Sequence, residues 1–144
     1  MKLIKISTDL KLSVHEFPYG SYKEQNRFLR ELIGNGCDIY EHVMPNRLYT
    51  DLKIENRPTK IPGKCVSMLV DGNGRLKENV PNLIGSYLYM TDEHGCPIMG
   101  NILFIGEKCG RDGIDFCGIE DSVFKLLELE LNNMIFAIKE ENVL

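Results

Sequence analysis

CVSMLVDGNG (residues 65–74), LIGSYLYMTDEHG (residues 83–95) and IMGNILFIG (residues 98–106) are three apolar runs, each bounded by turn-forming residues. Aromatic and β-branched runs that end in Asp, Asn or Gly are typical of antiparallel strands joined by tight turns, because those turn residues tolerate the positive φ that reverses a strand. The stretch therefore predicts an antiparallel meander with one strand in each segment. It predicts a scaffold and no chemistry.

Two segments outside the meander have helical periodicity. Residues 21–33 begin with Ser21-Tyr22-Lys23-Glu24, which matches the S-x-x-E capping box, and Gly34 follows the last apolar residue as a candidate C-cap. From Glu120 onward, apolar residues recur at helical spacing to about residue 140, and acidic side chains at the start favour a helix N-terminus. Alternation of apolar and polar residues predicts further strands over residues 2–7, 10–17, 38–44 and 114–117.

These elements predict one α+β domain over residues 1–144. We expect a mostly antiparallel sheet of about five to seven strands, with the two main helices (about 21–33 and 120–140) covering one face of it. The longest irregular segment, residues 45–63, contains three prolines, and within it residues 47–52 have the composition for one or two helical turns.

Composition predicts a protein of the cytoplasm. The chain has 144 residues, a net charge of -4 and no apolar run of the roughly 18 residues that a membrane span needs. The apolar part of Met1–Ser7 is too short for a signal peptide, so a first strand is expected there. The five cysteines are expected to be reduced, with Cys65 and Cys117 acting as small core residues.

The segment around residues 45–63 is the candidate binding site. Residues 44–78 carry seven basic against four acidic side chains in an otherwise acidic chain. Loops often carry binding residues, and this pattern of cations with an aromatic and amides suits an anionic ligand or a nucleotide. The alternative is a solvated loop with ordinary Lys and Arg content. The candidate residues are Arg47, Tyr49, Lys53, Arg57 and Lys60.

The Cys and His residues carry weaker signals. Two hairpin ends could bring His94, Cys96, Cys109 and Cys117 together as zinc ligands, but no pair has C-x-x-C spacing, so no metal site is predicted. Cys/His catalysis is disfavoured because no cysteine opens a clear helix or lies in a family signature. His15 and His42 are interpreted as solvent-facing strand residues.

The stretch from Val66 to Ile105 resembles the domain-of-unknown-function family 3846, which occurs in phages, plasmids and large DNA viruses. The resemblance rests on VDGNGRL (residues 70–76), the polar KENVPN (residues 77–82) and IGSYLY (residues 84–89), in the order capped helix, strands, closing helix. It covers most of residues 10–131, although the loop over residues 47–60 looks longer than in the family. It implies a small accessory protein of viral or mobile-element origin and assigns no catalytic residue.

The function that these observations favour is a small non-enzymatic accessory protein that binds a host protein or a small anionic ligand. One alternative is a nucleic-acid-associated protein using the basic loop; a second is a small Cys/His-dependent or metal-dependent enzyme. No residue pattern implies a cofactor. The helix is apolar around most of its circumference from Val123 to Ile138. Either it is enclosed by the sheet and the 45–64 loop, or its outer face pairs with the same helix of a second copy, which predicts a homodimer. We expect the protein in the cytoplasm, of the host cell if it is viral, with the nucleus left open.

Overall fold

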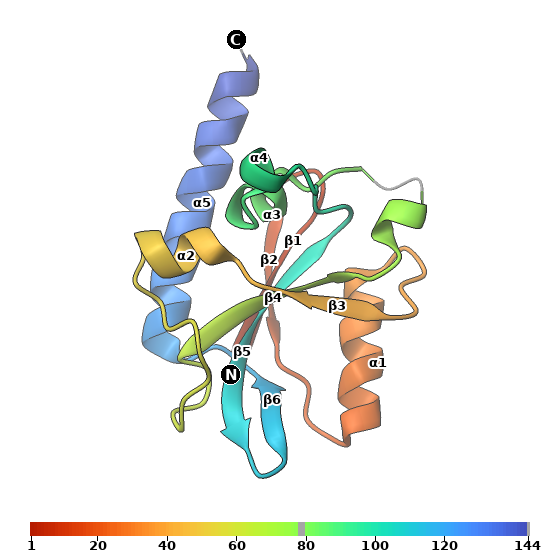
Figure 1. The fold of residues 1–144 in the computed structure, drawn as a ribbon, viewed down its shortest axis with the longest axis vertical. Helices are drawn as coiled ribbons and strands as arrows, with labels where there is room; N and C mark the ends of the chain where they lie inside the picture. Colours follow the sequence, from red (N-terminus) through yellow and green to blue (C-terminus); the bar gives the residue numbers. More distant parts are fainter. Residues whose placement is uncertain (78–79, 144) are drawn as a thin grey trace.

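Figure 1 shows the fold in a computed structural model, which describes residues 1–77 and 80–143. Glu78 and Asn79, part of the stretch that carries the family resemblance, lie outside the described residues. The strands are β1 (Lys2–Ile6), β2 (Leu12–Glu16), β3 (Tyr40–Val43), β4 (Cys65–Asp71), β5 (Ile102–Gly110) and β6 (Gly113–Cys117). The helices are α1 (Tyr22–Ile33), α2 (Asn46–Asp51), α3 (Leu83–Leu88), α4 (Thr91–His94) and α5 (Asp121–Val143), with a 3-10 turn at Gly74–Leu76.

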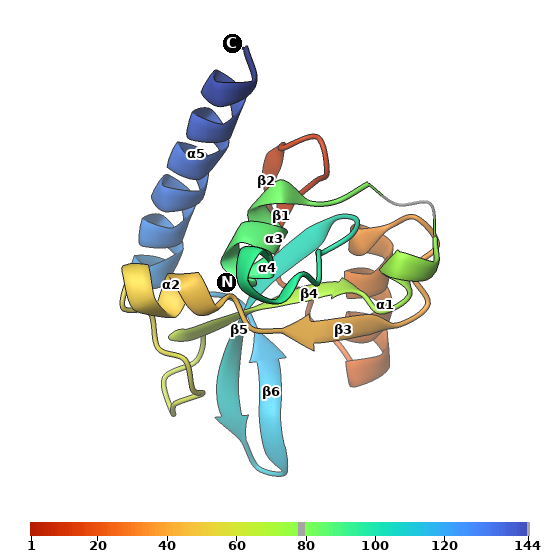
Figure 2. The same cartoon turned by 45° about the horizontal axis from the view of Figure 1, so that its top comes forward.

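The described strands form a six-stranded antiparallel sheet, which confirms the α+β prediction. The strand order is β2-β1-β5-β4-β3, and β6 continues beside the second half of β5. β5 is long enough to serve three neighbours: its first half pairs with β1, its middle with β4, and its last five residues with β6. The β5–β6 hairpin consequently projects beyond the rest of the sheet (Figure 2).

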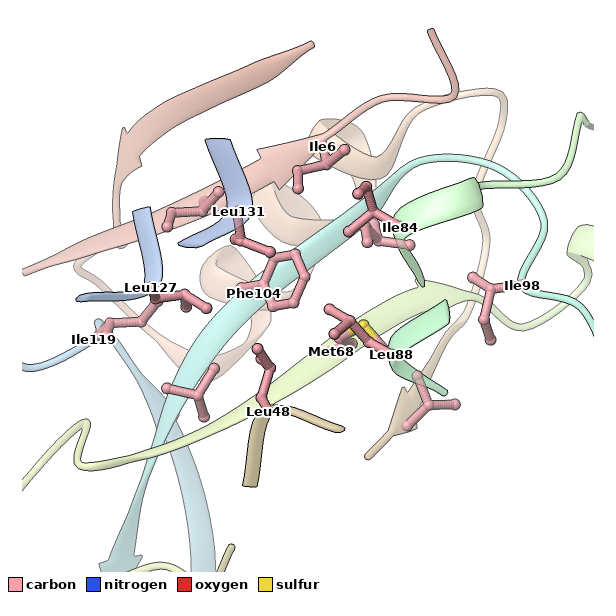
Figure 3. Close-up of a cluster of buried hydrophobic side chains, with 14 of the residues drawn as sticks. Ile6, Leu48, Met68, Ile84, Leu88, Ile98, Phe104, Ile119, Leu127 and Leu131 are labelled. Carbon is pink, nitrogen blue, oxygen red and sulfur yellow. The ribbon is translucent and has the colours of Figure 1, made fainter. Parts of the chain in front are cut away.

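The sheet buries both of its faces. Successive side chains along a strand point to opposite faces. Leu69 and Leu103 therefore pack with Leu29 of α1, while Met68 and Phe104 belong to the core on the opposite face, which includes Leu127 of α5. Figure 3 shows Phe104 and Met68 at the centre of the α5-side core, between side chains of α2, α3 and α5. Each such side chain stabilises the fold by roughly 1.5–3 kcal/mol. The expectation that both main helices cover one face is therefore wrong: α1 and α5 cover opposite faces.

The caps of α1 follow the sequence prediction. The Ser21 hydroxyl accepts a hydrogen bond from the Glu24 backbone N–H at 3.2 Å. The helix ends at Gly34, whose φ of 77° is a left-handed value that an L side chain rarely adopts. Leu29 and Ile33 are the buried positions of the apolar stripe.

The prediction of a middle strand in the meander is wrong, because residues 83–88 form the helix α3 and residues 91–94 form the short helix α4. Ile84 and Leu88, four residues apart, are buried, whereas Leu83 and Tyr87 are exposed, which is helical spacing. The side chain of Asn82 starts the helix by accepting from the Gly85 N–H at 3.0 Å. The third predicted strand begins at Ile102 and not at Ile98, and Met99 forms only an isolated bridge to Pro81.

The segment over residues 45–63 is anchored to the sheet along its length. Its predicted helical turns are α2, whose Leu48 is completely buried. Further on, Glu55 bridges to Cys65, and the Thr59 carbonyl accepts from the Cys109 N–H at 3.1 Å. At its end Gly63, with a φ of 79°, packs against the backbone that follows β6, and a Cβ there would lie 2.3 Å from the Gly118 carbonyl oxygen.

None of the helices in the described part of the chain is both long enough and apolar enough to cross a membrane. The five cysteines are free thiols, and Cys65 and Cys117 are buried, as the sequence predicts.

Candidate ligand-binding cleft

Two adjoining hollows lie where the β5–β6 hairpin projects past the start of α1. The first has a volume of about 250 Å³, and its walls include Phe17, Tyr40, Asp115 and Phe116. The second has a volume of about 270 Å³ and extends toward Pro62, at the end of the basic loop. We call the two hollows together the aromatic cleft. The side chains that line both are Phe17, Gln25, Lys108 and Phe116.

The polar wall of the cleft comes from α1 and β3. Asn26 donates to the Tyr40 hydroxyl at 2.9 Å and accepts from Arg30 Nε at 2.8 Å, so its orientation is fixed on both sides. Gln25 is held by donating to the Pro18 carbonyl at 3.2 Å. Burial raises the pKa of Tyr40. The Tyr40 hydroxyl therefore stays protonated at neutral pH and can act as a hydrogen-bond donor or acceptor at the cleft.

Lys108 is the cation of the cleft. It is half-buried and pairs in register with Asp115 across the β5–β6 hairpin, but it makes no ion pair within 4 Å among the described residues. Asp115 lines the first hollow and is absent from the walls of the second, which carries no acidic side chain among its described lining residues. The second hollow is therefore the place where an anionic group would meet Lys108 without facing a carboxylate.

Phe116 connects the cleft to a buried polar cluster. Its ring stacks on His42 at 5.7 Å between centroids and contacts Tyr40 at 6.1 Å. His42 in turn bonds through Nε2 to Glu107, which is only 2% exposed. Glu107 also accepts from the Ser67 hydroxyl at 2.7 Å. These residues fix the wall behind Phe116. The interpretation of His42 as a solvent-facing residue is incomplete, because its ring also bonds to Glu107 and stacks on Phe116.

Glu107 remains ionised despite its burial. Burial acts to raise the pKa of its carboxyl, but the hydrogen bonds from His42 and Ser67 stabilise the carboxylate and together bring the pKa below its ordinary value of 4.5. The neighbouring Cys65 thiol shows the opposite effect: burial, followed by the charge of Glu107, raises its pKa to about 12. Cys65 is therefore a neutral thiol and no nucleophile at physiological pH.

The cluster does not have the geometry of a catalytic triad. A triad needs the serine hydroxyl on one imidazole nitrogen and the carboxylate on the other. Here Ser67 and His42 Nε2 both bond to the same oxygen, Glu107 Oε1. Ser67 is also completely buried. The arrangement can orient His42 and hold Phe116, and it leaves Ser67 without an activating base.

Of the five predicted site residues of the basic segment, two are bonded to other parts of the fold and three are exposed. Arg47 forms a two-bonded ion pair with Asp92, both N–O distances being 2.8 Å, and lies over the Tyr87 ring. Tyr49 donates its hydroxyl to the Val66 carbonyl at 2.7 Å. Both side chains therefore bind within the fold. The remaining candidates, Lys53, Arg57 and Lys60, are exposed.

The weak zinc candidates lie at different parts of the molecule. His94 and Cys96 flank the end of α4, before β5 begins, whereas Cys109 lies near the other end of that nine-residue strand. His94 bonds instead to the Tyr89 carbonyl. Among the described residues, no three His, Cys, Asp or Glu side chains are placed to share a metal ion.

Sequence reasoning missed the cleft and the cluster behind it. Glu107 carries the one signal that was available: it is a charged residue directly after the apolar run NILFIG, at a position that continues the inward-facing alternation of Leu103 and Ile105. Its partner His42 is 65 residues away in the chain. No local pattern predicts that pairing.

Comparison of the chain with family models, with curated proteins and with solved structures finds no match. The resemblance to family 3846 therefore stays an expectation.

Proposed function

We propose that this protein is a small non-enzymatic binding protein that holds a flat anionic ligand in the aromatic cleft. The observation that supports this most directly is that Phe17, Phe116 and Lys108 line both hollows. Aromatic faces stack on planar rings, at roughly 1–3 kcal/mol per ring in nucleic-acid complexes, and a half-buried ammonium group attracts an anion more strongly than an exposed one.

The charges suggest how such a ligand lies. Its anionic group would occupy the second hollow, close to Lys108 and away from Asp115. Its hydrogen-bond donors would face Asp115 and the Tyr40 hydroxyl in the first hollow. Lys60 is exposed two residues before Pro62, which lines the second hollow, so the basic loop adds to the attraction for an anion. Lys60 therefore remains a candidate residue, with the role of attracting the anionic ligand toward the cleft.

A single small ligand fits these features better than a polynucleotide. The two hollows together have room for about one nucleotide, and the chain carries a net charge of -4. Proteins that track a nucleic acid backbone present an extended basic surface, because much of their affinity comes from phosphate neutralisation. Arg47, the first cation of the segment, is already paired with Asp92.

The test is a titration followed by amide chemical shifts, with adenosine monophosphate and phenyl phosphate as probes. We expect both to shift amides around Gln25, Lys108 and Phe116, and adenosine without phosphate to bind several-fold more weakly. In Lys108→Gln, adenosine monophosphate should bind no more tightly than adenosine. Arg111, an exposed cation at the hairpin tip, gives the matched control: in Arg111→Gln the difference in affinity between the two ligands should remain. If neither probe shifts these amides, or Lys108→Gln binds like wild type, the proposal fails.

The broader role that we propose is that of an accessory protein of a virus or mobile element, acting in the cytoplasm of its host and forming a homodimer. The support is the resemblance over Val66–Ile105 and the apolar character of α5. The neighbouring genes test the origin, because a setting of ordinary chromosomal housekeeping genes would contradict it.

A further inference from the structure

α5 has two apolar faces, and the fold covers one of them. Phe124, Leu127, Leu131 and Ile135 form the covered face and pack against the sheet. The C-terminal half of the helix projects beyond the body of the domain in both views (Figures 1 and 2).

The second face carries large apolar side chains in solvent. Leu126 is 40%, Leu129 59% and Phe136 66% exposed, and Asn133 between them is also exposed. The four positions have spacings of three, four and three residues. This is the a/d pattern of a coiled coil, with Leu126 and Asn133 at a and Leu129 and Phe136 at d. We call these four residues the outer stripe.

We propose that the outer stripe is covered by the outer stripe of a second copy of this chain, in a parallel two-stranded coiled coil. This inference rests on the homodimer proposed above and specifies its surface and orientation, and it is independent of the ligand in the aromatic cleft. In this register Lys125 occupies a g position and Glu130 the next e position. A parallel pair of helices brings each g residue to the following e residue of the other helix.

Charge complementarity selects the parallel orientation. Two symmetric contacts form between Lys125 of one copy and Glu130 of the other, and neither residue makes an ion pair within 4 Å among the described residues of its own chain. In the antiparallel alternative the g positions face one another, so Lys125 would lie opposite Lys139 of the second copy. That contact is repulsive.

Asn133 supports the same conclusion. An asparagine at a single a position specifies two strands in register, because it can bond to the asparagine of the partner helix and is costly in other arrangements. In the parallel dimer Asn133 meets Asn133 of the second copy. In the antiparallel arrangement it would meet Leu129, which leaves its amide without a partner in an apolar layer.

The first experiment measures assembly by sedimentation equilibrium up to about 1 mM protein, because a coiled coil of about two heptads associates weakly. We expect a concentration-dependent dimer for the wild type. Leu129→Glu should weaken association at least roughly tenfold, and circular dichroism should show an unchanged fold because Leu129 is exposed. A wild type that remains monomeric throughout, or a Leu129→Glu variant that dimerises as well as wild type, overturns the proposal.

The second experiment tests the orientation by exchanging charges. Lys125→Glu and Glu130→Lys should each weaken the dimer, and the double exchange should restore it, because the parallel contacts then reappear with reversed signs. Lys139→Glu is the matched control: it should leave a parallel dimer unchanged and strengthen an antiparallel one, in which it faces Lys125. Strengthening by Lys139→Glu, or failure of the double exchange to restore association, overturns the parallel arrangement.

Discussion

Asn82 shows how one completely buried polar side chain sets the local structure. Its Oδ1 accepts from the Gly85 N–H at the start of α3, and its Nδ2 donates at 3.1 Å to both the Ile6 and Gly100 carbonyls. The amide lies 76 residues after Ile6 and therefore connects the end of β1, the turn before β5 and the start of α3. Burying an amide is costly unless its hydrogen bonds are made, and here they are made by the backbone.

At the residue scale we predict that Asn82→Ala lowers the free energy of unfolding by about 3 kcal/mol, the sum expected for a lost helix cap and two unsatisfied buried carbonyls. Asn82→Ser keeps the capping oxygen and loses the two donors, so its free energy of unfolding should lie between those of wild type and Asn82→Ala. Urea unfolding measures both. Equal losses in the two variants would show that capping contributes nothing.

At the scale of elements, two contacts at the ends of the basic segment hold it against the helices and the sheet. Arg47 links α2 to α3 and α4, because it pairs with Asp92 and also donates to the Tyr87 carbonyl at 2.6 Å. At the other end of the segment, Gly63 and Gly106 lie in direct backbone contact. A Cβ on Gly106 would lie 2.7 Å from Gly63 Cα and 2.3 Å from the Gly118 carbonyl oxygen.

We predict that Arg47→Ala lowers the midpoint of thermal unfolding, whereas Arg57→Ala, an exposed cation of the same segment, leaves it unchanged. Planar two-bonded pairs between arginine and carboxylate are the stronger class of ion pair, and Arg47→Lys should recover part of the loss. A double-mutant cycle with Asp92→Ala isolates the pair. A coupling energy of zero would show that the pair does not stabilise the fold.

The glycine contact gives a second prediction at this scale. Gly106→Ala should destabilise the protein by roughly 3 kcal/mol or more, because neither backbone can move without shifting a central strand. Gly95→Ala is the control: no atom lies within 4 Å of its Cβ position, so only the left-handed backbone is penalised, at roughly 1 kcal/mol. Chemical denaturation compares the two, and a smaller loss for Gly106→Ala would contradict the packing argument.

At the scale of the whole molecule, stability depends on carboxylates that the fold keeps ionised. Besides Glu107, the carboxyl of Glu120 has a pKa lowered to about 2, first by the hydrogen bond from the Ser122 hydroxyl and then by backbone N–H groups at the start of α5. A carboxyl with a lowered pKa in the folded state contributes stability above its unfolded pKa, and this is lost as pH falls through the folded value.

We therefore predict that the free energy of unfolding declines between about pH 4.5 and about pH 2, as these carboxylates take up protons. Glu107→Gln removes one of them, so it should be destabilised at pH 7 and lose less stability than wild type on acidification. Unfolding in urea at pH 7, 4 and 3 measures the difference. Parallel pH profiles for the two proteins would show that folding does not lower the pKa of Glu107.

The elements whose pattern is local follow from the sequence alone. Residues 2–7 and 65–70 form strands, and the capped residues 21–33 with their period of 3.6 form a helix, where they are expected. Only the helical period also describes which side is buried, because β4 is buried along its whole length. The same holds for α5, whose period begins at Glu120. Periodicity, however, records that a face is covered and does not record what covers it.

The tertiary structure decided everything that depends on distant partners. Residues 83–90 have a strand-like composition, but residues 83–88 form a helix whose cap, Asn82, is held by the Ile6 and Gly100 carbonyls elsewhere in the fold. The placement of α1 and α5 on opposite faces follows from the strand order, which no local pattern contains. The aromatic cleft and the pairing of His42 with Glu107 arise for the same reason: side chains that are far apart in the sequence come together only when the sheet has formed.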